Sequence, residues 1–192
     1  MNKKKGSHFC ITEMAYESEY HHAICATGAL AVVCKVLRHT SNEDVYQNVC
    51  CLFGPIGDCE EARDIIRKGK GLEPVLETLQ SDACRENQGL MQMVIEALHK
   101  TAISPANCEV HKSHGAVNLV LDRLHEGVGE SIVYNILGFL AEMTRTEACR
   151  QSIRASDSLL FIMDYMLHDI QFIKMKAAVA TSRMGADKDS TF

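Results

Sequence analysis

The chain has 192 residues, of which 46% are hydrophobic and 23% are charged, and its net charge is −5. This composition is typical of a folded protein, and the acidic balance disfavours nucleic acid or an anionic membrane as the main partner. The longest apolar run, residues 29–34, is too short to cross a bilayer, so no membrane partner is expected.

The N-terminal segment begins with three consecutive lysines at 3–5 and has no apolar run of the length that a secretory signal needs. We expect residues 1–23 to form a tail with a partial leading helix. The nine cysteines are odd in number and too sparse for a disulfide scaffold, which indicates free thiols in a reducing compartment. The sequence therefore predicts a cytoplasmic chain, with the nucleus as a second location.

Four segments share one apolar pattern. In each, a pair of residues that contains glycine or another small residue comes first. Apolar side chains follow at relative positions 0, 3, 4 and 7, starting at Leu30, Leu72, Val117 and Leu159. The four starts are 42, 45 and 42 residues apart. Apolar residues at this spacing predict a helix with one buried side.

A second, wider pattern follows each copy, with apolar or small residues at positions 0, 4, 5, 7, 8 and 11 from Val45, Leu90, Ile132 and Ile173. This width predicts a helix that is buried between neighbouring repeats. The three extra residues of the second copy are expected in a turn at 81–87, where a repeat tolerates a change of length.

A short third element precedes the next copy of the pattern. It covers residues 58–68, 104–113 and 146–155, and Asp58, Ser104 and Thr146 are the expected N-caps. Two helices with a short leading helix, repeated about every 42 residues, are typical of the armadillo/HEAT class.

Over residues 24–184 the chain resembles the armadillo-repeat family. The resemblance lies in the Gly-small-aliphatic start of the second helix, as at Gly28 and Gly115, and in small apolar pairs within the third helix. It implies an all-α fold, a right-handed α-solenoid of about four armadillo repeats, whereas the alternative is an irregular all-α domain. The repeats are expected near 24–65, 66–110, 111–153 and 154–184, followed by a disordered tail at 185–192.

In armadillo proteins the third helices line a concave groove that holds an extended peptide or a partner protein. The resemblance therefore implies a non-enzymatic interaction scaffold or adaptor that binds its partner through third-helix positions 3, 6 and 10. In this register those positions are Asn48, Cys51, Pro55, Met93, Glu96, Lys100, Asn135, Gly138, Glu142, Lys176, Val179 and Arg183, with Gln47, Gln92 and Tyr134 on the rim.

The predicted groove departs from two known groove types. Importin-like grooves place Trp at position 6 and Asn at position 10, but this chain has no Trp, and its position 10 is Pro55, Lys100, Glu142 and Arg183. Catenin-like grooves are strongly basic, whereas Glu96 and Glu142 offset the cations here. The remaining prediction is a mixed groove that is neutral at the first repeat and basic at the last.

A Cys/His-rich metal-binding or thiol-redox module is the alternative from another functional class. Zinc sites use paired ligands, but the chain has no Cys-x-x-Cys. The best local clusters are His21, His22 and Cys25, and then His111 and His114. Burial as small hydrophobic residues accounts better for Cys34, Cys50, Cys59, Cys108 and Cys149, so neither a metal nor a cofactor is expected.

Motifs for catalysis are missing from the sequence: it has no Gly-x-Ser-x-Gly elbow, phosphate-binding glycine loop or His-Glu-x-x-His helix. We therefore expect no enzymatic activity. Gly127 is expected to end a helix rather than to bind phosphate. A helical regulatory subunit of a larger assembly, such as a co-chaperone or a cytoskeletal adaptor, remains a third interpretation.

The ends of the predicted array lack obvious polar caps, which repeat arrays need. Ile162, Phe172 and Ile173 would have little beyond them to pack on. We therefore expect the chain either to be part of a longer solenoid or to associate with itself end to end.

Overall fold

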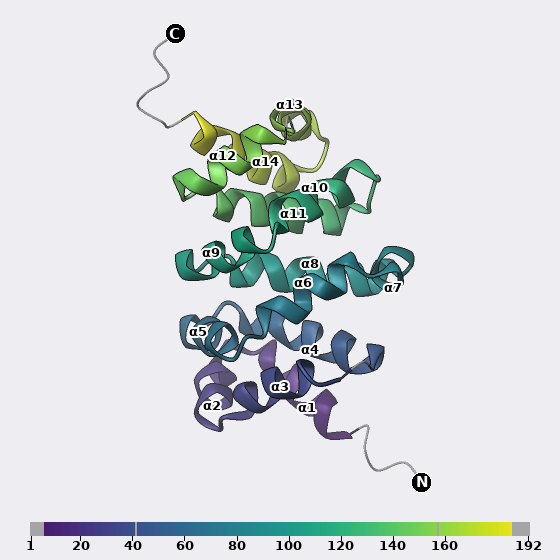
Figure 1. Cartoon of the computed structure of the whole chain (residues 1–192), viewed down its shortest axis with the longest axis vertical. Helices are drawn as coiled ribbons and strands as arrows, with labels where there is room; N and C mark the ends of the chain where they lie inside the picture. Colours follow the sequence, from purple (N-terminus) through teal and green to yellow (C-terminus); the bar gives the residue numbers. More distant parts are fainter. Residues whose placement is uncertain (1–5, 41, 157, 186–192) are drawn as a thin grey trace.

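The computed structural model describes residues 6–40, 42–156 and 158–185, and within these ranges every regular element is a helix. The helices stack along the long axis of the molecule, with α1 near one end and α14 near the other (Figure 1). They are α1 (Gly6–Ala15), η1 (Ser18–Tyr20), α2 (His21–Ala26), α3 (Ala29–Leu37), α4 (Glu43–Ile56), α5 (Glu60–Lys68), α6 (Leu72–Gln80), α7 (Asp82–Glu86), α8 (Gln88–Thr101), α9 (Pro105–Ser113), α10 (Ala116–His125), α11 (Glu130–Met143), α12 (Glu147–Ala155), α13 (Leu159–Asp164), η2 (Tyr165–Leu167) and α14 (Gln171–Met184).

The helices form four units, α2–α3–α4, α5–α6–α8, α9–α10–α11 and α12–α13–α14. The last member of each unit is the longest, at 14 residues. These third helices form a continuous layer, because α4 packs against α8, α8 against α11, and α11 against α14. The predicted all-α solenoid is thus confirmed.

The core lies between successive units, as the wide apolar pattern of the third helices predicts. Phe53 and Phe139 are fully buried. The ring of Phe53 lies against Gly71 of the next unit, where an added Cβ would be 3.2 Å from it. Cys50 is also buried, beside Cys84 of that unit. Third-helix positions 5 and 8 therefore face the following repeat.

The glycine at the start of the second helix is explained by the backbone of the preceding turn. Gly28 and Gly115 have φ angles of 72° and 68°, and Lys70 occupies the same turn with φ 55°. L-residues adopt this left-handed region at a cost that glycine avoids. The fourth equivalent, Asp157, lies outside the described residues. The glycine before the second helix is thus explained by the left-handed backbone of this turn.

The N-terminal region is more ordered than a tail with a partial leading helix. Helix α1 packs against α4, in the place that a third helix of a preceding repeat would take, and η1 and α2 follow it. Of the expected tail, residues 1–5 lie outside the described part. At the other end only Gly185 of the expected tail 185–192 is described.

Three details of the expected connections differ. Residues 82–86 form the short helix α7 instead of a plain turn, because the Ser81 hydroxyl accepts a hydrogen bond from the Cys84 amide at 3.1 Å. The N-cap of α5 is Cys59 and not Asp58. The expected repeat boundaries near 65, 110 and 153 fall inside α5, α9 and α12, so a division at the preceding turns keeps each helix whole.

The other expected caps are in place. Ser104 is the N-cap of α9 but makes no side-chain capping bond, and Pro105 occupies the first helical position as expected. The Thr146 hydroxyl accepts from the Cys149 amide at 3.4 Å at the start of α12. Gly127, with φ 78°, follows the end of α10 as a C-terminal cap glycine would.

The C-terminal end differs from the expectation that three apolar residues lack packing partners. Ile162 and Ile173 are each only 1% exposed, whereas Phe172 is 68% exposed. At the positions of α14 that would face a further repeat, the residues are Ala178 and Thr181 in place of large apolar side chains. Large apolar side chains are nevertheless exposed at this end, among them Leu160, Leu167 and Phe172.

No single helix among the described residues is both long and apolar enough to span a membrane. By length and composition alone the pair Ser18–Ala26 and Ala29–Leu37 passes that test, but its two parts meet at a bend of 77°. In the fold, α2 and α3 pack against α5.

Candidate functional site: the third-helix face

The predicted binding residues lie along the layer of α4, α8, α11 and α14, and we call their partly accessible surface the third-helix face. Asn48, Gln92 and Val179 are exposed, and Asn135 and Gly138 are buried. The remaining predicted residues are half-buried: Gln47, Cys51, Pro55, Met93, Glu96, Lys100, Tyr134, Glu142, Lys176 and Arg183.

Between α4 and α8 the face is held by one sulfur contact and one ion pair. The Cys51 thiol lies 3.0 Å from the Met93 thioether sulfur. The Lys100 ammonium donates to both carboxylate oxygens of Asp58, at 2.8 and 3.0 Å. Both contacts join residues 42 apart in the sequence, so they link neighbouring repeats.

Glu96 lies between these two contacts and packs on Gly54, where an added Cβ would be 3.1 Å from its carboxyl carbon. Burial raises the pKa of Glu96, and the nearby Lys100 opposes that rise. Glu96 belongs to no ion pair within the described ranges. Its carboxylate therefore remains an uncompensated charge on this part of the face.

A network of hydrogen bonds, which includes the buried His99 and Asn135, links α8 to α11. His99 Nδ1 lies 2.9 Å from Asn135 Oδ1, and Asn135 Nδ2 donates to the Ser131 carbonyl at 3.1 Å. Since the Asn135 oxygen can only accept, His99 Nδ1 carries the proton and Nε2 is left as an acceptor. The exposed Gln92 closes the same edge, because its Oε1 accepts from the Ser131 hydroxyl at 3.0 Å.

His99 is the residue of this face that sequence reasoning missed. It is only 5% exposed and sits over Gly138, where an added Cβ would approach its ring to 2.4 Å. The signal was present, because the equivalent positions in the other third helices are small: Gly54, Ala141 and Ser182. A large side chain where the other repeats have a small one, opposite a glycine at position 6 of the next third helix, indicates that the large side chain occupies the space above that glycine. We call this space the notch.

The imidazole of His99 also meets α14. Lys176 Nζ lies 3.5 Å from His99 Nε2 and 5.3 Å from the centroid of the Tyr134 ring. Burial, together with the charge of Lys176, lowers the pKa of His99 to about 4, although the bond to Asn135 works in the opposite direction. His99 is therefore neutral at physiological pH.

The remaining charges of the C-terminal part are mostly engaged. Glu142 forms an ion pair with Arg145 at 2.8 Å. The Arg183 guanidinium donates to the Ala141 carbonyl. Lys176 is different, because within the described residues it contacts only neutral groups.

A pocket lies beside Lys176, between the starts of α11 and α14. Tyr134 and Ile173 form part of its apolar wall together with the exposed Phe172. The same Tyr134 ring lies under the Lys176 ammonium. The complete lining is Glu130, Ser131, Tyr134, Asn135, Ile170, Phe172 and Ile173, which we call the α11–α14 pocket.

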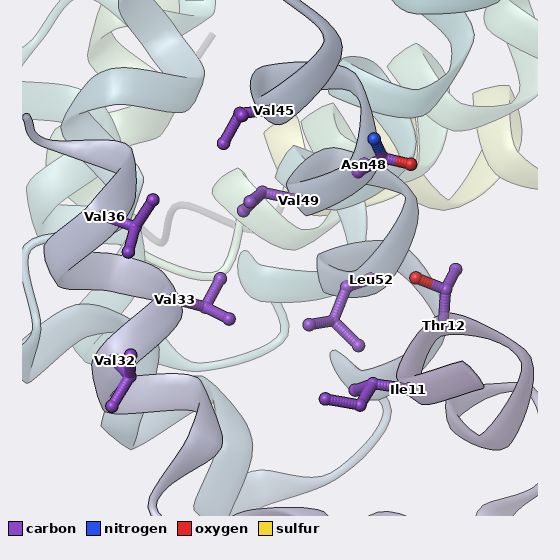
Figure 2. A pocket seen from close by; sticks show the side chains of 9 residues that line it. All are labelled: Ile11, Thr12, Val32, Val33, Val36, Val45, Asn48, Val49 and Leu52. Atoms are coloured by element: carbon purple, nitrogen blue, oxygen red, sulfur yellow. The ribbon is translucent and has the colours of Figure 1, made fainter. Parts of the chain in front are cut away.

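A second apolar pocket, of about 120 Å³, lies at the N-terminal end between α1, α3 and α4. Figure 2 shows valines of α3 facing α4 side chains across it, with Ile11 of α1 closing one side. Val32 and Val36 are 62% and 46% exposed. Asn48, predicted as a groove residue, lines this pocket, and its amide donates to the Asp44 carbonyl at 2.6 Å.

The cysteine and histidine clusters that suggested a metal site do not converge. His21 Nε2 bonds the Ala15 carbonyl at 2.7 Å, and Cys25 lies beside Cys59 with its pKa raised to about 12 by burial. His111 Nε2 lies 3.2 Å from the Thr101 hydroxyl, inside the core. No group of three potential ligands could hold a metal ion in the parts of the chain that are described.

The eight described cysteines are free thiols, and seven of them are buried. Burial raises the pKa of four of the predicted core thiols, Cys34, Cys50, Cys108 and Cys149. A raised pKa opposes thiolate formation, which redox chemistry requires. The thiol-redox alternative is therefore not supported at these positions.

No protein-family model matches the sequence. Solved structures do match the fold. An engineered protein matches with a TM-score of 0.79 and 16% identity over 94% of this chain and 74% of its own. A designed armadillo repeat protein in complex with a (KR)4 peptide matches with a TM-score of 0.76 and 15% identity, covering 92% of this chain and 73% of that one.

The chain has an armadillo-like repeat fold. A further structure, of computationally designed armadillo repeat proteins for modular peptide recognition, matches with a TM-score of 0.74 and 16% identity over 90% of this chain and 72% of that one. At these identities the likeness concerns the fold, and the armadillo-like architecture agrees with the family resemblance read from the sequence.

Proposed function

We propose that this armadillo-like chain is a non-enzymatic interaction scaffold that binds an extended segment of a partner protein along the third-helix face. The observation that carries the proposal is the continuous layer of third helices, whose accessible side chains change in charge from one repeat to the next. The designed armadillo repeat proteins of the same fold, made for peptide recognition, support this use of the layer.

The partner differs from the basic (KR)4 peptide of the designed protein. The face carries Glu96, which belongs to no ion pair among the described residues, but its C-terminal part carries Lys176 and Arg183. A uniformly basic peptide would meet repulsion there, so we propose a partner segment of mixed charge. We place the protein in the cytoplasm or nucleus, which the free thiols support.

Site-specific photocrosslinking tests the location. A 12-residue peptide, selected from a random display library against the full chain, is mixed with protein carrying a photoreactive residue at Gln92 or at Asn118. Both positions are exposed, but Gln92 lies on the third-helix face and Asn118 on α10. We expect crosslinks from position 92 only. Crosslinking from 118 alone would contradict the proposal.

Groove substitutions at Lys100 or Asn135 would be poor tests. Lys100 forms an ion pair with Asp58, and Asn135 is buried and hydrogen-bonded to His99. Loss of binding after either change would reflect altered packing between repeats. Gln92 is a better position, because it is exposed and its contact with the next repeat is an exposed hydrogen bond with Ser131.

The N-terminal pocket favours a second proposal, that the chain associates with itself through this end. A second copy would cover Val32 and Val36 by placing its own valines against them about a two-fold axis. Light scattering tests this: we expect a dimer, and a monomer for Val36→Asp. The control Ala31→Asp changes an exposed residue of α3 that does not line the pocket. A wild-type chain that is monomeric at all concentrations would refute it.

A further inference from the structure

Lys176 differs from the other cations of the third-helix face in what its charged group touches. Lys100 binds the Asp58 carboxylate, and Arg183 donates to the Ala141 carbonyl. The Lys176 ammonium, among the residues that the structure describes, meets only His99 Nε2 and the face of the Tyr134 ring. It is therefore held in place without a counter-charge.

The position of this ammonium is fixed by its neighbours. The His99 ring is locked by Asn135 and lies in the notch over Gly138, so its Nε2 offers one acceptor at a set place. The Tyr134 ring adds a cation–π contact at 5.3 Å. A half-buried ammonium with one neutral hydrogen-bond partner retains donors for a carboxylate, which would form a charge-assisted bond.

The α11–α14 pocket adjoins this cation through Tyr134, which belongs to both. Phe172 is 68% exposed at its edge and Ile173 is buried beneath, so the pocket offers apolar contact to a side chain. Glu130 lines the same pocket and is exposed. It disfavours a carboxylate inside the pocket and leaves Lys176 as the favoured place for one.

We propose that Lys176 and the α11–α14 pocket form a subsite for an Asp or Glu side chain that neighbours an apolar side chain in an extended partner segment. The acidic side chain bonds the Lys176 ammonium, and the apolar one enters the pocket beside Tyr134. Charge complementarity selects this occupant, because the Lys176 ammonium has no counter-charge among the described residues, whereas Glu96 on α8 places an anion further along the same face. The subsite rests on the proposed groove function and adds the chemistry of its ligand.

A double-mutant cycle tests the subsite. From the peptides selected against the full chain, one 12-residue sequence is synthesised with acetylated and amidated ends, together with its Glu→Gln or Asp→Asn form. We expect selected sequences to carry an acidic residue next to an apolar one, and the amide form to bind the wild-type chain about tenfold more weakly. In Lys176→Met this difference should vanish.

Two further variants complete the cycle. Lys176→Arg keeps the charge and should keep the preference for the acidic peptide. This variant tests the role of the charge even if Lys176→Met does not fold. Lys35→Met removes an exposed lysine of α3 and should behave as the wild type. A peptide with a free C-terminal carboxylate and no acidic side chain is included as a separate arm.

The outcomes separate the subsite from the groove function. If the wild type selects peptides but Lys176→Met keeps the full acidic preference, the subsite is overturned and the groove function stands. Binding that needs only the free C-terminal carboxylate also overturns it. A wild-type chain that enriches no sequence contradicts the groove function and the subsite together.

Discussion

At the scale of single residues, two buried histidines make the stability of the fold depend on pH. Burial lowers the pKa of His99 to about 4 and that of His111 to about 3. An unfolded histidine titrates near pH 6.5, so between about pH 6.5 and pH 4 the unfolded chain binds more protons than the folded one. Acidification through this window therefore destabilises the protein.

For His99 the free energy of unfolding should fall by about 2 kcal/mol between pH 7 and pH 5, with a similar contribution from His111. Urea denaturation at the two pH values measures the loss. His99→Gln should remove the His99 share, whereas His39→Gln, at an exposed position, should leave the loss unchanged. An unaltered pH dependence in His99→Gln would show that this ring is not buried as described.

The turn between the first and second helices gives a prediction of stabilisation. Lys70 holds φ 55° where two other repeats have glycine, so Lys70→Gly should stabilise the chain by about 0.5–1 kcal/mol once the greater freedom of unfolded glycine is subtracted. Gly115→Ala should cost about 1 kcal/mol by backbone strain alone, because nothing lies within 4 Å of its added Cβ. Thermal unfolding measures both changes. If Lys70→Gly lowered the stability, the left-handed conformation of Lys70 in this turn would be contradicted.

At the scale of elements, α8 and α11 are coupled through the notch at Gly138. Gly138→Ala should destabilise the protein by about 1–2 kcal/mol, because the new Cβ would displace the His99 ring. In a His99→Ala background the same change should instead stabilise by about 0.5–1 kcal/mol, since alanine is the better helix former. Chemical denaturation of the wild type, the two single variants and the double variant completes this double-mutant cycle. Equal effects of Gly138→Ala in both backgrounds would exclude the coupling.

The helices were predictable from sequence where periodicity repeats. The apolar patterns from Leu30 and Val45 fix one face of each helix, and four copies in register fix the architecture. Helix α1 was not predictable in this way, because its sequence belongs to no repeated copy and its position depends on contact with α4. The same holds for α7, which depends on the local cap at Ser81.

The candidate site was predictable as a set of positions but not as a set of contacts. The register correctly placed Lys100, Asn135 and Lys176 on one layer. It could not show that Asn135 is buried against His99 or that Lys100 is held by Asp58, because these bonds join different repeats. Contacts between side chains 36 or 42 residues apart depend on how closely the helices stack.

At the scale of the whole molecule, the two ends of the array differ. The last third helix has Ala178 and Thr181 where earlier ones turn large apolar side chains toward the next repeat, but it also exposes Phe172 and Met175. The first repeat keeps Val45, Val49 and Leu52 facing a pocket that α1 covers only in part. The proposed association at the N-terminal pocket rests on this partly covered apolar surface, which includes the exposed Val32 and Val36.

The central claim is that a partner segment lies on the third-helix face, and methionine-methyl NMR tests it most directly. Met93 on α8 is a predicted groove residue, and the exposed Met175 on α14 is at the helix position that Gln92 and Tyr134 occupy on the rim, while Met163 and Met166 are exposed on α13 and η2. When the selected peptide is added, we predict that the methyl signals of Met93 and Met175 shift and those of Met163 and Met166 stay in place. Shifts confined to Met163 and Met166 would contradict the account.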